Sequence, residues 1–111
     1  MNSPSPRLAS KPKAAARAKA QRWEDCQSLA QIPNIGPAMV GDFRLLGIHT
    51  PQQLRGQDAL ALYRRLCQIT ATRHDPCVLD TLMAATDFMG GAPATPWWHY
   101  TAQRKALYPE I

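Results

Sequence analysis

The sequence lacks the features that are typical of membrane proteins, β-sheet proteins and disulfide-rich proteins. No apolar run approaches the ~20 residues that a membrane-spanning helix needs. No stretch alternates apolar and polar residues as a strand does, and valine occurs only at Val40 and Val78. The three cysteines are an odd number at irregular spacing, which makes a poor disulfide framework. These absences predict an all-α protein without a membrane span, with free thiols in the cytoplasm.

The first 22 residues lack any acid, and this absence divides the chain. They hold six of the 13 lysines and arginines, whereas residues 23–111 hold the other seven and all eight acids. A stretch this polar does not bury enough apolar surface to offset the entropy lost on ordering. We therefore predict a flexible basic tail over residues 1–20 and one domain over residues 21–111. The basic residues of the acid-free stretch are Arg7, Lys11, Lys13, Arg17, Lys19 and Arg22.

The tail also lacks the apolar segment of a secretory signal. Its Ala, Lys and Arg content leaves a transit peptide open as an alternative. Prolines at positions 4, 6 and 12 disfavour the amphipathic helix of such a peptide. A solvated leader without a role in binding is the other alternative.

Capping residues and apolar spacing divide the domain into short helices. We predict a first helix that ends at about Gln31 and a second that runs from Pro37 to a left-handed stop at Gly47. Later helices are expected to begin after polar N-caps, at Thr50, Asp58, Asp75 and Thr95. The helix that follows Asp58 is expected to direct three side chains toward the core, those of Leu62, Leu66 and Ile69. The pattern predicts a small all-α bundle of about five or six short helices.

The turn between the first two helices reads Ile-Pro-Asn-Ile-Gly over residues 32–36. Ile32 and Ile35 are expected to anchor it in the core. Asn34 tolerates left-handed backbone angles, and Gly36 leaves room for a ligand. The turn should bring the start of the next helix to the surface, where unpaired N–H groups and the positive dipole end favour an anion. Such a helix start is a suitable phosphate site.

The chain resembles the helix-hairpin-helix motif of DNA-binding and repair proteins over the stretch IPNIGPAMVGDFRLLGI. With LYRRLCQITATRHDPCVLDTLMAATDF and PWWHYTAQRKALYP included, it resembles the small bacterial family of pathogenicity-locus or mitomycin-resistance proteins. The C-terminal domain of the competence regulator TfoX is similar at a greater distance. The resemblance covers residues 29–109. It implies a helix-hairpin-helix fold and a link to DNA, but no reaction.

The hairpin departs from many DNA-binding examples at three positions. Asn34 stands where they carry glycine, Ala38 where they carry a basic residue, and Asp42 adds a carboxylate one turn further into the helix. The missing cation and the added carboxylate both weaken a phosphate site. The later stretch ITATRHDPCVLD is a candidate second hairpin that lacks the apolar-glycine signature. We therefore expect the hairpin alone to bind weakly.

The sequence favours a non-catalytic module that binds double-stranded DNA through its phosphate backbone without reading the sequence, with a role in repair or damage resistance. The basic tail would supply most of the affinity by releasing counterions. No cofactor and no metal are expected. The predicted contacts outside the tail are Pro33, Asn34, Ile35, Gly36, Ala38, Met39 and Arg44. Flanking candidates are Arg55, Arg64, Arg65 and Arg73.

A protein-interaction adaptor with the same fold is the main alternative. Zinc prefers thiol and imidazole ligands, but the sequence has no CxxC pair, and cysteines in an α-helical core are usually small buried hydrophobes. The residues of the right type for zinc are Cys26, Cys67, His74 and Cys77.

One thiol and one aromatic cluster suggest further chemistry. Cys77 lies at a predicted helix start just after His74, which makes it the one candidate nucleophile, although an enzyme is not predicted. Trp97, Trp98 and Tyr100 could stack on bases. A lid that closes a small core is the simpler interpretation of these aromatics.

Overall fold

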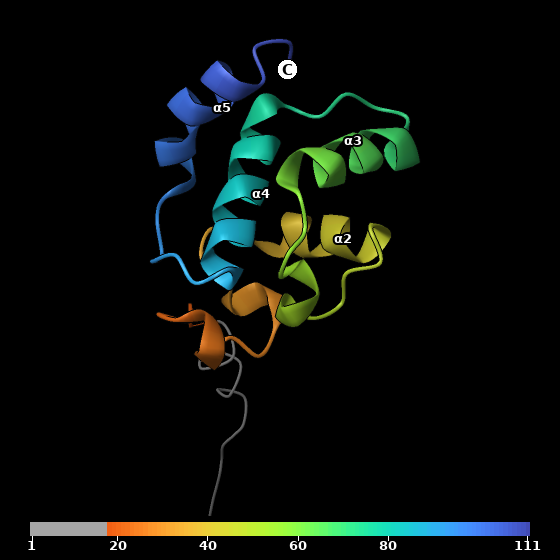
Figure 1. Cartoon of the computed structure of the whole chain (residues 1–111). Helices are drawn as coiled ribbons and strands as arrows, with labels where there is room; N and C mark the ends of the chain where they lie inside the picture. Colours follow the sequence, from red (N-terminus) through yellow and green to blue (C-terminus); the bar gives the residue numbers. More distant parts are fainter. Residues whose placement is uncertain (1–17) are drawn as a thin grey trace, which may run out of the picture.

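Figure 1 shows the computed structural model of the chain, which describes residues 18–111. This range contains four α-helices, four 3-10 helices and no strand, so the all-α prediction is confirmed for it with fewer α-helices than expected. No helix in it has the length and apolar composition of a membrane crossing. The α-helices are α2 (Pro37–Leu45), α3 (Ala59–Thr70), α4 (Pro76–Met89) and α5 (Thr101–Leu107). The 3-10 helices are η2 (Trp23–Asp25), η3 (Leu29–Gln31), η4 (Pro51–Leu54) and η5 (Trp97–Tyr100).

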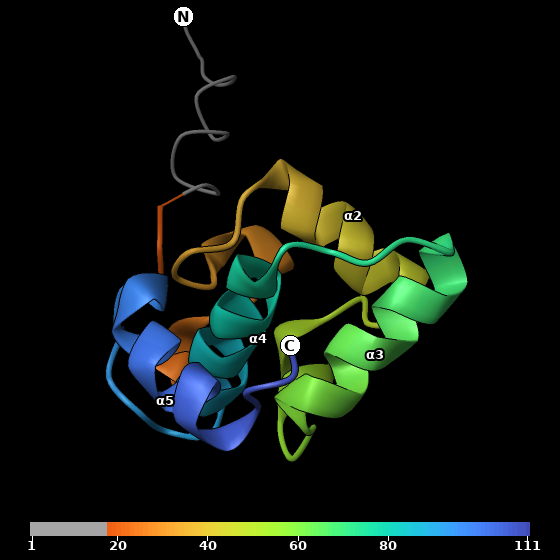
Figure 2. The ribbon, with the colours of Figure 1, turned by 90° about the horizontal axis from the view of Figure 1, so that it is seen from above.

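Helix α4 is the centre of the fold. Figures 1 and 2 show it between α5 on one side and α2 and α3 on the other. Nine of its 14 residues are buried, as expected for a helix covered from several directions. Its start is capped as predicted, because the Asp75 carboxylate accepts a hydrogen bond of 2.9 Å from the Cys77 N–H and Pro76 occupies the first helical position.

A buried ion pair joins α5 to the middle of α4. Asp80 is 1% exposed and Arg104 is 8% exposed. Arg104 Nε donates to Asp80 Oδ1 at 2.8 Å, and Thr101 Oγ1 donates to Asp80 Oδ2 at 2.8 Å. A carboxylate buried this deeply needs charged, hydrogen-bonded partners. The two residues lie 24 positions apart, so no local pattern in the sequence indicates this cross-helix role of Arg104.

The ion pair leads to a stability prediction. Arg104→Met should lower the free energy of unfolding by about 3–5 kcal/mol, because it leaves the Asp80 charge buried without a partner. The double variant with Asp80→Leu should recover most of that loss. Arg64→Met is the matched control, since Arg64 pairs with Glu110 where both side chains are 58% exposed, and it should cost about 1 kcal/mol or less. Urea unfolding measures all three, and similar losses for Arg104→Met and Arg64→Met would contradict the assignment.

The segment before the hairpin differs from the prediction. The expected first helix is absent as an α-helix in the described residues, where two single 3-10 turns, η2 and η3, occupy its place. The Gln31 Oε1 atom accepts hydrogen bonds from the N–H groups of Gln27 at 2.8 Å and Ser28 at 3.0 Å. The Gln31 side chain therefore accepts hydrogen bonds from backbone N–H groups that would bond to backbone carbonyls in an α-helix. Pro33 also disfavours helical angles at Ile32.

The inward face of α3 was predicted correctly at Leu62 and Leu66 but not at Ile69. Ile69 is 49% exposed, whereas Tyr63 is buried at 3%. The buried stripe is centred on Leu62, Tyr63 and Leu66, and Ile69 lies at its edge in the last turn. The Asp58 cap is confirmed, because its carboxylate accepts a 2.9 Å hydrogen bond from the Ala61 N–H.

Helices α2 and α3 end in the same left-handed motif with different residues. After α2, Gly47 has φ of +80°, and the Ile48 N–H bonds to the Phe43 carbonyl at 2.8 Å. After α3, the equivalent position is Ala71 with φ of +54°. Left-handed angles strain any residue with a Cβ atom, so α3 ends with strain that α2 avoids.

Exchanging the two end residues should change stability in opposite directions. Gly47→Ala should destabilise the fold by roughly 1 kcal/mol through backbone strain alone, because a Cβ atom there meets no atom within 4 Å. Ala71→Gly should stabilise it by up to about 1 kcal/mol. Chemical denaturation of both variants checks the pair, and a stabilising Gly47→Ala would refute the left-handed assignment.

Candidate functional site

The hairpin turn is pinned to the core at two points. Ile32 and Ile35 are 0% and 1% exposed, as predicted, and the Ile35 N–H bonds to the Ile32 carbonyl at 3.1 Å. Asn34 lies between them with φ of +73°, the left-handed geometry expected from the sequence. The chain then passes through Gly36 into α2 at Pro37. The turn therefore presents the start of α2 in a fixed orientation.

The start of α2 is open to a ligand. Gly36, Pro37 and Ala38 are exposed, and Met39 is half-buried. Within residues 18–111, no hydrogen-bond acceptor is recorded for the N–H groups of Ala38 and Met39, and Gly36 has no side chain that could cap them. A Cβ atom built on Gly36 meets no atom within 4 Å. Two donors at the positive end of a nine-residue helix therefore face open space.

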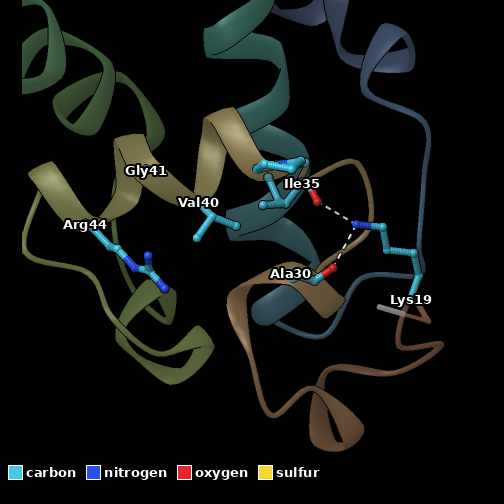
Figure 3. Close-up of a pocket in the computed structure, with 8 residues that line it drawn as sticks. Lys19, Ala30, Ile35, Val40, Gly41 and Arg44 are labelled. Carbon is cyan, nitrogen blue, oxygen red and sulfur yellow. Dashed lines mark hydrogen bonds between the residues drawn. The ribbon is translucent and has the colours of Figure 1, made fainter. Parts of the chain in front are cut away.

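A groove of about 480 Å³ lies beside this helix start. Its walls are mainly apolar and come from Ile35, Pro37 and Val40. Figure 3 shows Lys19 and Arg44 at opposite ends of the groove, with Ile35 and Val40 between them. The groove therefore combines an apolar wall with a cation at each end.

Lys19 braces the hairpin. Its Nζ atom donates to the carbonyls of Ala30 at 2.8 Å and Ile35 at 2.5 Å, the two bonds drawn in Figure 3. Burial lowers the pKa of Lys19, and the Cys26 thiol nearby opposes that shift. The next residue, Ala20, is buried and its N–H bonds to the Gln31 carbonyl at 2.8 Å. Residues expected at the end of the tail thus pack on the domain.

Asn34 has a structural partner that accounts for its difference from glycine. Its Nδ2 atom donates to the Thr95 carbonyl at 2.8 Å, across 61 residues of sequence. Thr95 belongs to the connection between α4 and η5. The side chain thus ties the hairpin to the far end of the chain. The side chain of Asn34 therefore has a structural role, and the ligand contact predicted for this residue stays a prediction.

Two substitutions separate the roles of Asn34. Asn34→Ala loses both the left-handed tolerance and the hydrogen bond, and should cost about 2 kcal/mol. Asn34→Gly keeps the backbone geometry and loses only the bond, so it should cost about 1 kcal/mol or less. Thermal unfolding gives the comparison. If glycine costs as much as alanine, backbone strain makes no contribution at this position.

The other predicted contacts differ in their surroundings. Arg44 is exposed in the groove, as a ligand contact requires. Arg22 lies 3.9 Å from Glu24 and 3.7 Å from Asp25, so acids partly offset its charge. Pro33 is half-buried in the turn. The remaining predicted contacts lie outside the described residues, namely Arg7, Lys11, Lys13 and Arg17.

The thiols do not form a common centre. In the part of the chain that the structure describes, no three His, Cys, Asp or Glu side chains gather as a metal site would require. Burial raises the pKa of the Cys77 thiol, and Asp75 raises it further, which is the opposite of activation. The His74 ring lies 3.0 Å from Thr70 Oγ1, a contact that directs it to α3.

The C-terminal aromatics divide between core and surface. Tyr100 is buried, and this burial together with Asp87 raises its pKa to about 12. Trp97 is half-buried, and Trp98 is 60% exposed with its ring edge against Trp97 at a centroid distance of 5.8 Å. The expected lid is therefore formed by Tyr100 and part of Trp97. Arg55 covers the Trp23 ring at 3.7 Å, a cation–π contact that the sequence did not indicate.

Comparison with known proteins identifies the family of this chain. Residues 22–106 match the model of a family described as Cdd1, pathogenicity locus. The chain is also 43% identical over 83 residues to the mitomycin resistance protein McrB of Streptomyces lavendulae, an alignment that covers 75% of this chain and 79% of that protein. No solved structure matches the chain. The matched range includes the hairpin and all four α-helices except the last residue of α5, and the chain belongs to the pathogenicity-locus family.

Proposed function

We propose that this protein is a non-catalytic module that binds the phosphate backbone of double-stranded DNA through the start of α2. The observation that carries the proposal is the open pair of N–H donors on Ala38 and Met39, with Arg44 on the same helix. Backbone donors at a helix start bind phosphate oxygens, and the dipole favours their negative charge. The hairpin would then act as in the helix-hairpin-helix proteins that it resembles.

Such a contact is independent of DNA sequence. Phosphate oxygens are alike at every step of a duplex, so N–H groups and cations that bind them position the protein without reading bases. The relative from Streptomyces lavendulae is named for mitomycin resistance. We place the DNA contact in damage resistance or repair, in the cytoplasm. An apolar groove beside the hairpin gives support to a second candidate, a protein-interaction adaptor whose partner would insert apolar side chains there.

The hairpin supplies little charge for this function. The ammonium group of Lys19 is hydrogen-bonded to two carbonyls, and Asp42 adds a carboxylate on α2 itself. Residues 18–111 hold nine lysines and arginines against eight acids. We therefore assign most of the affinity to the four cations of residues 1–17, which are Arg7, Lys11, Lys13 and Arg17.

The salt dependence of duplex binding tests the role of the tail. A truncated chain should begin at residue 18, because Lys19 and Ala20 pack on the domain. Removing four cations should make the slope of log affinity against log salt shallower by up to roughly 3.6. Fluorescence anisotropy with a labelled duplex at several salt concentrations gives both slopes. Identical slopes for the two chains would show that the tail does not contribute to DNA binding. An affinity that does not change with salt concentration would favour the protein-interaction adaptor.

Gly36→Asp tests the hairpin directly. Gly36 has the extended angles of an N-cap, φ −99° and ψ −177°, so an aspartate there should cap α2 and leave the fold at least as stable. Its carboxylate would occupy the two N–H groups and repel phosphate, so duplex affinity should fall roughly tenfold. Gln103→Glu, at an exposed position of α5, is the control for the same change in charge. Equal losses of duplex affinity in the two variants would show that the hairpin is not the DNA contact.

A further inference from the structure

A second groove, of about 590 Å³, lies along α3 and the loop after it. Its walls include Tyr63, Arg64, Arg65, Cys67, Thr72 and Arg73. It shares no lining residue with the groove at the hairpin. It is therefore a feature separate from the start of α2, and it contains three of the four arginines that the sequence named as flanking candidates.

This arginine groove concentrates positive charge. It holds three of the nine lysines and arginines of residues 18–111, and none of its lining side chains is acidic, although Ile111 with its main-chain carboxylate also lines it. The same 94 residues carry eight acids, so their charges nearly cancel overall. Like charges this close repel one another, and Glu110 offsets only the charge of Arg64. A bound anion would relieve that repulsion.

The guanidinium groups keep donors available for such an anion. Arg64 pairs with Glu110 at 3.2 Å, but both side chains are 58% exposed, so water weakens the pair. Arg65 uses Nη2 on the Leu46 carbonyl at 3.2 Å, which leaves its other donors. No acid of residues 18–111 forms an ion pair with Arg73, which is exposed. Most of the five N–H donors of each arginine thus remain for a ligand.

The arginines are not needed to cap α3. The Cys67 carbonyl accepts from the Thr72 N–H at 3.1 Å, and the Gln68 carbonyl accepts from the Ala71 N–H at 3.2 Å. The Thr70 carbonyl accepts from Thr72 Oγ1 at 3.2 Å. Backbone and hydroxyl donors therefore satisfy three of the last four carbonyls of the helix. The arginines are therefore not required as hydrogen-bond donors to these carbonyls.

We propose that the arginine groove binds a phosphate group through Arg64, Arg65 and Arg73. Guanidinium forks match the oxygens of phosphate, and several forks around one groove suit a group with more than one negative charge. The phosphate belongs either to a free phosphate ester or to the backbone of a duplex. The proposal stands apart from the hairpin, because it depends on different residues.

Pyrophosphate is the probe, added to the full chain at constant ionic strength with chloride as the reference. Binding to the folded state should raise the midpoint of thermal unfolding as the pyrophosphate concentration rises. Arg73→Gln should weaken this binding roughly tenfold, the effect of one charge-assisted hydrogen bond. Lys105→Gln, at an exposed position of α5 outside both grooves, removes the same charge and should leave pyrophosphate binding unchanged.

Duplex affinity of the same variants distinguishes the two sources of phosphate. If Arg73→Gln weakens duplex binding, the groove takes the DNA backbone. If it weakens only pyrophosphate binding, the ligand is a free phosphate ester. The proposal is overturned if Arg73→Gln alters neither, or if Lys105→Gln lowers pyrophosphate binding as much. Gly36→Asp reports on the hairpin separately, so failure of one site does not imply failure of the other.

Discussion

The buried carboxylate of Asp80 constrains the whole C-terminal part of the fold. An ionised carboxylate in a core is costly unless charged, hydrogen-bonded groups surround it. Arg104 and Thr101 supply those groups, so α5 has to lie against the middle of α4. The adjoining η5 is then held along α4 as well, where its Tyr100 side chain closes the core. One polar interaction thereby fixes the direction of the chain after α4.

The orientation of the hairpin depends on this arrangement. The chain between α4 and η5 carries Thr95, whose carbonyl accepts the hydrogen bond of Asn34. Lys19 holds the turn separately through the carbonyls of Ala30 and Ile35. The turn is therefore preorganised, and a ligand would not have to order it on binding. This rigidity is why we place the function at the start of α2 although the local charge is small.

Interactions within a few residues were predictable from the sequence, and longer ones were not. The cap at Asp58 was found because its partner lies three residues away. The absence of the first helix could not be predicted, because the Gln31 side chain accepts the backbone N–H donors only in the folded turn. The Asp80–Arg104 pair spans 24 residues, and no local pattern selects one arginine from several. The tight turn at residues 32–36 was predictable from its local pattern. The bracing role of Lys19 was not, because its neighbours in the sequence are also basic and predict a continuation of the tail.

The amide resonances of α2 give the most direct test of the proposed function. Full-length protein labelled with nitrogen-15 is titrated with a short duplex and followed by two-dimensional NMR. The account predicts that the amides of Ala38 and Met39 shift together and saturate with the overall binding curve. The Ala61 amide, at a helix start that Asp58 already caps, should stay in place. Saturable duplex binding that leaves Ala38 and Met39 unmoved would contradict the account.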